Sequence, residues 1–320
     1  VISLLKNLGY IDTMGSVSSA ITQSGDLAWA FAEAGAWHTI PALGRAIFKR
    51  SKITREDVGI TDIAHEFTDA GISNRLLQWT FTLTGLRYVD TIGKETLMGA
   101  AVSRMRRMAR KALAGDLKAM EEVMRKLNPV YGKESYRALL YFASGEINDT
   151  IRRFAFDVLS DYQPVTQLES TEGYLKSVFF RVLYMIEIYT LKQFDIYRNK
   201  VWHEIRDGFK KNDKAGVIRG LRNLIRIAAY LILCNATADL IKALLFNRHL
   251  EPEDLLWDNL FRLFGLSKWQ ISRIRKDPTP GSFMELVAPP GKFATAAMQD
   301  IVWPDEKGLR TVDSIPLVGK

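Results

Sequence analysis

Cysteine is nearly absent from the sequence, and its scarcity excludes two kinds of stabilised fold. The single cysteine among 320 residues, Cys234, has no partner for an internal disulfide and cannot build a cysteine-cluster zinc site. The four histidines are scattered along the chain and do not supply a set of metal ligands in its place. We therefore expect no metal site in this chain.

Motifs that carry catalysis are also missing. A histidine followed by glutamate occurs at 65–66 and at 203–204, but aspartate stands where a zinc-protease helix needs its second histidine. Neither a Gly-x-Ser-x-Gly nucleophile motif nor a Gly-x-x-x-x-Gly-Lys-Ser/Thr phosphate loop occurs. The sequence thus predicts a non-enzymatic segment with no catalytic residue and no cofactor.

Glycine and proline are too few for a collagen-like or loop-dominated chain, at 22 and 10 residues. Six of the ten prolines fall within residues 277–320, at Pro278, Pro280, Pro289, Pro290, Pro304 and Pro316. For residues 277–320 we predict a proline-rich extended strap that lies over a helical body and has no core of its own.

The rest of the chain predicts an all-α fold. Hydrophobic residues make up 47% of the sequence, and their spacing of three and four residues recurs in nearly every long stretch. The pattern breaks at Tyr162-Gln163-Pro164. We predict a multi-helix bundle with an N-terminal helical subdomain over 1–161 and a long helical hairpin plus short helices over 165–276.

Individual helices follow from glycine and proline positions. Residues 26–50 predict two short helices interrupted by Gly35 and Pro41, and 88–113 predict one long helix that stops before Gly115. Further helices are expected over 116–127, closed by the pair Asn128-Pro129, and over 135–144 and 146–160. The antiparallel hairpin is expected to pair 174–209 with 213–250 through a polar turn.

Uncharged apolar runs are short. The best membrane-span candidate covers residues 227–238, is flanked by Arg226 and Asp239 and contains Asn235, whereas a span needs about 20 apolar residues. We interpret it as a buried core helix and expect no integral transmembrane span. Residues 27–44 carry little charge and fit either core packing, which we favour, or a membrane interface.

Charge is the feature of the sequence that permits an acidic binding partner, because the net charge is +8 and the pI is about 9.4. The basic residues form helical clusters that could contact nucleic-acid phosphates, at Arg104, Arg106, Arg107, Arg110 and Lys111 and at Arg219, Arg222 and Arg226. The alternative is that these side chains cover apolar faces and pair with neighbouring acids, and the sequence favours this second interpretation.

Several short passages carry a family resemblance in their order along the chain. They are Asp26-Leu27-Ala28, residues 89–96, 184–186, 191–195 and 264–268, the pair Pro289-Pro290, and residues 315–320. Together they resemble the helical C-terminal region of large phage polyvalent and internal virion (ejection) proteins, such as giant virion-packaged RNA polymerase-type chains. None of these passages is a catalytic signature, so the resemblance carries no site residue.

The resemblance implies a structural helical domain that is delivered with the genome and acts in DNA ejection and virion assembly. Its partners would be other virion, ejection, portal or tail proteins and could include DNA. It would be located in the virion interior and, after ejection, in the host cell envelope or cytoplasm. Because the sequence begins and stops within apolar patterns, we expect a fragment of a much larger protein that carries any polymerase activity elsewhere. The alternative is a non-sequence-specific nucleic-acid-binding accessory domain of a virion-packaged polymerase.

Overall fold

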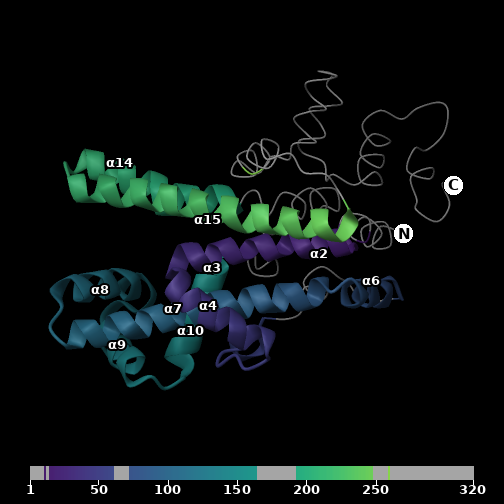
Figure 1. The fold of residues 1–320 in the computed structure, drawn as a ribbon. Coiled ribbons are helices and arrows are strands. Elements are labelled where there is room, and N and C mark those ends of the chain that lie inside the picture. The colour runs from purple at the N-terminus through teal and green to yellow at the C-terminus, as the bar shows by residue number, and fades with distance from the viewer. Residues whose placement is uncertain (1–10, 12–13, 61–71, 164–191, 248–258, 260–320) are drawn as a thin grey trace, which may run out of the picture.

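The described residues of the computed structural model form an all-α fold. They comprise residues 11, 14–60, 72–163, 192–247 and 259, of which 86% are helical and none lies in a strand. The predicted all-α class is therefore confirmed for this part of the chain. The helices are α2 (Val17–Gln23), α3 (Leu27–Ala34), α4 (Ala36–Ile47), α6 (Ile72–Leu83), α7 (Leu86–Leu113), α8 (Leu117–Tyr131), α9 (Ser135–Ser144), α10 (Asp149–Tyr162), α14 (His203–Lys210) and α15 (Lys214–Phe246) (Figure 1).

Helix α7 is the element on which the others pack. Thirteen of its 28 residues are buried, and helices α3, α4, α8, α9 and α10 all contact it. Small side chains bring the α4 backbone close, since the Ala42 Cβ atom would stand 3.6 Å from a Cβ atom added at Gly99. The position of α4 against α7 matters below, because a groove lies between them.

Capping residues and glycines mark the ends of several helices. Asp116 and Asn148 cap α8 and α10 by accepting hydrogen bonds of 3.1 Å from the Ala119 and Ile151 amides. Gly35, at φ 76°, separates α3 from α4 as expected, since this conformation disfavours other residues. The predicted bounds of α7 and α9 and the predicted end of α10 also agree with the structure to within a few residues.

Two predicted proline breaks are wrong, because both prolines lie inside helices. Pro41 is within α4 and Pro129 is within α8. Each proline removes one backbone hydrogen bond, but the residues that follow it keep their contacts with the rest of the body, so the helix continues. Ala42 and Ala46 are buried beyond Pro41, and α8 continues to Tyr131, whose hydroxyl donates to the Thr150 carbonyl.

The described part of the hairpin comprises a helical stretch over 192–197, the π-helical turn that follows it (Arg198–Trp202), α14 and α15. Asn212 adopts a left-handed conformation, φ 53°, in the turn, and α14 packs along the start of α15 (Figure 1). Glycines permit this contact, because a Cβ atom at Gly208 would stand 2.7 Å from the Val217 amide nitrogen. Residues 165–191, 248–258 and 260–276 of the predicted hairpin region, and the strap at 277–320, lie outside the described residues.

Helix α15 is not the buried core helix that we expected. Ile227, Leu231 and Ala238 are buried, and Tyr230 stacks on Phe31 of α3 with ring centroids 5.5 Å apart. Large apolar side chains on its remaining surface are exposed, among them Ile225, Leu233, Leu240, Leu244 and Leu245. By length and composition alone, α15 is the one candidate membrane span among the described residues, with a mean hydropathy of 1.6 over an 18-residue window of which 17% is buried. The absence of an integral span stays a prediction.

A buried carboxylate joins the helices of the body. Glu33 on α3 forms an ion pair with Lys126 of α8 and accepts a hydrogen bond of 2.7 Å from the Tyr162 hydroxyl of α10. Arg104 of α7 donates to the Glu33 carbonyl and pairs with Glu122 of α8 at 2.6 Å. Burial raises the pKa of Glu33, but Lys126, Lys200 and the two hydrogen bonds outweigh it and lower the pKa to about 2.

We predict that Glu33→Gln lowers the free energy of unfolding by about 3 kcal/mol at pH 7, because it leaves Lys126 without its anion. Since the pKa of Glu33 is lowered from 4.5 to about 2, its stabilisation is present above pH 4.5 and is lost as the pH falls towards 2. Urea denaturation of both proteins should therefore give a much smaller difference at pH 2.5 than at pH 7. Glu121→Gln, at an exposed site on α8, is the control, and an equal difference at both pH values would contradict the assignment.

Candidate anion-binding groove

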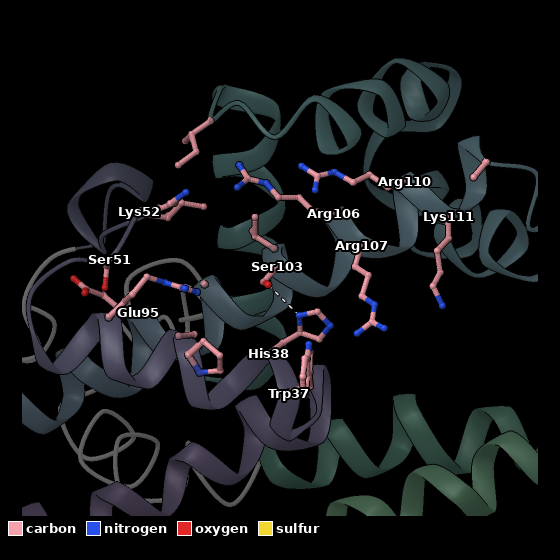
Figure 2. A pocket seen from close by; sticks show the side chains of 18 residues that line it. Trp37, His38, Ser51, Lys52, Glu95, Ser103, Arg106, Arg107, Arg110 and Lys111 are labelled. Carbon is pink, nitrogen blue, oxygen red and sulfur yellow. Dashed lines mark hydrogen bonds between the residues drawn. The ribbon is translucent and has the colours of Figure 1, made fainter.

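A groove of about 650 Å³ lies between α4 and α7 (Figure 2). Helix α4 contributes residues from Trp37 to Arg45, the segment after it contributes 51–53, and α7 contributes residues from Glu95 to Lys111. Ala114 and Ile147 complete the lining. The groove thus joins parts of the chain that are up to about a hundred residues apart.

Positive charge dominates this lining. Six basic side chains line the groove, namely Arg45, Lys52, Arg106, Arg107, Arg110 and Lys111. The acidic lining residue is Glu95, and burial raises the pKa of its carboxyl against the opposing effect of Ser51. The groove therefore attracts anions.

Helix α7 presents four of these cations together because of their spacing. Arg106 and Arg110 are one helical turn apart, as are Arg107 and Lys111. Arg107 and Lys111 point towards Trp37 and His38, whereas Arg106 and Arg110 point in another direction (Figure 2). Met105, Ala109 and Ala112 of the same helix are buried against the core. All four cations grouped by the sequence pattern line the same groove.

Carboxylates do not neutralise these four cations in the described structure. Arg106 donates to the Glu146 carbonyl at 3.1 Å, and Arg110 donates to the Ala143 carbonyl at 3.2 Å. For Arg107 and Lys111, no ion pair or hydrogen bond to another described residue is present. Burial and the nearby Arg110 lower the pKa of Arg106, which reflects the cost of holding like charges together.

Histidine and tryptophan lie at the edge of the same groove. His38 Nδ1 and Ser103 Oγ are 3.0 Å apart, and the 79% exposed Trp37 ring lies beside His38 (Figure 2). Burial, followed by the charges of Arg107 and Arg104, lowers the pKa of His38. His38 is therefore neutral near pH 7 and offers a polar atom without adding charge.

The other predicted binding residues lie elsewhere. Arg104 is engaged with Glu33 and Glu122, and Arg219 pairs with Asp213 at 3.2 Å and Glu204 at 3.5 Å. For these two arginines the alternative interpretation, pairing with acidic neighbours, is correct. Arg226 donates to Asn223 and Arg222 is exposed on α15, so neither contributes to the groove.

Two groove residues, Arg45 and Lys52, were not predicted. Each is separated from the α7 cluster by more than 40 residues, so no local spacing groups them with it. They reach the groove because α4 packs closely on α7 at Gly99. A predicted contact between α4 and α7 would have been needed to find them.

Comparison with known proteins adds no assignment, because no family model, curated protein or solved structure matches the chain. Within the described ranges, no group of three or more histidine, cysteine, aspartate or glutamate side chains is arranged to hold a metal ion. The chemistry of the groove therefore follows from its own residues. Guanidinium and ammonium groups around an open hollow bind anions, and phosphates in particular accept paired hydrogen bonds from arginine.

We predict that Arg107→Gln raises the pKa of His38, because it removes a positive charge that disfavours the imidazolium. The measurement is an NMR titration of the histidine ring protons, with His38→Gln used to assign the signal among the four histidines. Arg45→Gln, in the same groove but not acting on His38, serves as the control. An unchanged His38 titration in Arg107→Gln would contradict the geometry of the groove.

Proposed function

We propose that the groove between α4 and α7 binds the sugar-phosphate backbone of nucleic acid without reading its sequence. The observation that carries this proposal is the convergence of basic side chains in one groove, where described carboxylates do not neutralise Arg106, Arg107, Arg110 and Lys111. Backbone contacts of this kind provide affinity and fix orientation without distinguishing bases. This function corresponds to the alternative raised in the sequence analysis, a nucleic-acid-binding accessory domain that does not read sequence.

The length of the groove favours a polymer over a small anion. The residues of α7 that line it run from Glu95 to Lys111, about 24 Å at the rise of a helix. In one strand of a duplex, successive phosphates advance by about 3.4 Å along the helix axis, so this length matches several of them. A mononucleotide would leave most of the cations unpaired.

We predict that the double variant Arg107→Glu, Lys111→Glu loses most of its affinity for fluorescein-labelled DNA at low salt, because two cations become anions. In the wild type the affinity should fall with salt, and removing two phosphate contacts should flatten the logarithmic slope by about 2. Fluorescence anisotropy between about 25 and 200 mM salt measures both effects.

The matched control reverses two exposed lysines outside the groove, Lys118→Glu and Lys133→Glu. It changes the net charge by the same amount and should retain most of the affinity, because a specific groove and not overall charge binds the DNA. Equal losses in both double variants would mean that net charge alone attracts DNA. Absence of wild-type binding at 25 mM salt would end the proposal.

We also propose that the chain is a structural helical domain of a phage internal virion protein that is ejected with the genome. The order of the resembling passages supports this, as do the exposed apolar side chains of α15, among them Leu233 and Leu244, which offer a surface to virion partners. The multi-helix bundle, the complete hairpin and the extended C-terminal strap belong to the same proposal. So do the partners among virion, portal and tail proteins and the locations in the virion interior and the infected host.

We predict that peptides of this chain, as part of a much longer parent protein, are found in purified phage particles. Mass spectrometry of gradient-purified virions and of the intact parent chain is the measurement. A parent of ordinary length that is absent from the particles would contradict the proposal. Detection of the same peptides only in infected-cell lysate, and not in particles, would also contradict the proposal.

A further inference from the structure

A second hollow adjoins the groove along α7. It encloses about 370 Å³, and Ser51 and Glu95 line both hollows. The stretch of α7 from Arg87 to Glu95 lines the second hollow, and the stretch from Glu95 to Lys111 lines the first. The two hollows therefore follow one another along the same helix.

The lining of the second hollow differs from that of the first. Thr82, Thr91 and Tyr88 bring hydroxyl groups, and Lys49 at the end of α4 brings a positive charge. Arg55, which pairs with Glu56 at 2.9 Å, and Arg87 also line this hollow. Among described residues, Lys49 makes no ion pair and no side-chain hydrogen bond. The second hollow thus combines basic side chains, of which Lys49 is unengaged among described residues, with hydroxyl and aromatic surface, whereas six basic side chains line the first.

Each hollow has an aromatic ring that is open to solvent. Tyr88 is 46% exposed, and its hydroxyl donates to the Ile47 carbonyl at 2.9 Å, which restrains the ring against the end of α4. Trp37 is 79% exposed in the first hollow. Exposed aromatic rings of this kind stack on nucleic-acid bases of any type, because every base has a flat face.

We infer that the ligand is a single strand of nucleic acid that lies along α7 and occupies both hollows, an inference that rests on the function proposed above. Trp37 and Tyr88 stack on bases, and Lys49 contacts a phosphate beyond the first hollow. A duplex does not fit this arrangement, because its bases stack on one another and their faces are not free for aromatic side chains.

The two hollows also define a site size. From Arg87 to Lys111 helix α7 extends about 36 Å, which corresponds to about 10 nucleotides at the stacked spacing of 3.4 Å and to fewer in a stretched strand. A strand of four nucleotides fills only one hollow, and the more cationic first hollow will hold it. Longer strands reach the second hollow and gain its contacts.

The test compares oligothymidylates of 4, 8 and 12 nucleotides with a 12-base-pair duplex in anisotropy measurements at one low salt concentration. The variant Lys49→Asn, Tyr88→Ala removes the unengaged cation and the ring of the second hollow, and asparagine tolerates the left-handed backbone of residue 49, φ 53°. The matched control is Lys133→Asn, Tyr136→Ala, which makes the same chemical changes at exposed positions outside both hollows. Circular dichroism checks that both variants are folded.

We expect wild-type affinity to rise from the 4-mer to the 12-mer and to exceed that for the duplex. The variant should bind the 12-mer about tenfold more weakly while its 4-mer affinity changes less than twofold, because the 4-mer does not reach the second hollow. The control should match the wild type for every strand. Oligouridylates of the same lengths, run in parallel, distinguish a strand of RNA from a strand of DNA.

Three results would overturn the inference and leave the proposed function standing. They are equal affinity for the 4-mer and the 12-mer, an unchanged 12-mer affinity in the Lys49→Asn, Tyr88→Ala variant, and equal affinity for the 12-mer and the duplex. In each case Arg107→Glu, Lys111→Glu would still abolish binding through the first hollow. Failure of the wild type to bind any strand would overturn the proposed function and the inference together.

Discussion

The buried Glu33 carboxylate is the constraint on which the arrangement of the helical body depends. A carboxylate that is 6% exposed must be neutralised and hydrogen-bonded, and the partners of Glu33 come from α8 and α10, at Lys126 and Tyr162. Arg104 adds α7 to the same junction through the Glu33 carbonyl and Glu122. Four helices are thus joined around one side chain.

The core packing of α7 also determines which of its side chains face solvent. Thirteen of its residues are buried and Arg104 is held at the junction, while the cations further along the helix line the groove. The small residues of α4 and α7, Ala42 and Gly99, then bring Arg45 and Lys52 within reach of that groove. The same helix therefore contributes to both the core and the groove, and the core packing of α7 determines which of its charges remain unpaired.

The sequence predicted the features that depend on local structure. Apolar spacing identified the all-α class, and Gly35 identified the break between α3 and α4. The four-residue spacing also grouped Arg106, Arg107, Arg110 and Lys111, which all line the groove. Features that depend on distant contacts were missed. Pro41 and Pro129 do not end helices, because packing on other helices outweighs one lost hydrogen bond.

The difference between local and distant contacts also explains which basic residues are paired with acids. Whether an arginine is paired depends on acids far away in the sequence, as with Arg104, whose partners Glu33 and Glu122 are 71 and 18 residues away. Nothing local separates Arg104 from Arg107, yet one belongs to the core junction and the other to the groove. For α15, apolar spacing predicted burial, but only Ile227, Leu231 and Ala238, with two glycines near its start, are buried. Periodicity identifies an apolar face without specifying what covers it.

Helix α15 is a long, stiff element of the structure. Its 33 residues form a continuous rod of about 50 Å, which α14 stiffens at one end through the close contact at Gly208. The rod contacts the body through several elements, because Tyr230 stacks on Phe31 of α3, Asn235 lies against Gly25, and α2 also packs on α15. Since α3 also carries Glu33, a displacement of α15 against the body would act on the helix whose carboxylate joins α3 to α8 and α10. The long helix and the core junction are thus mechanically coupled through α3.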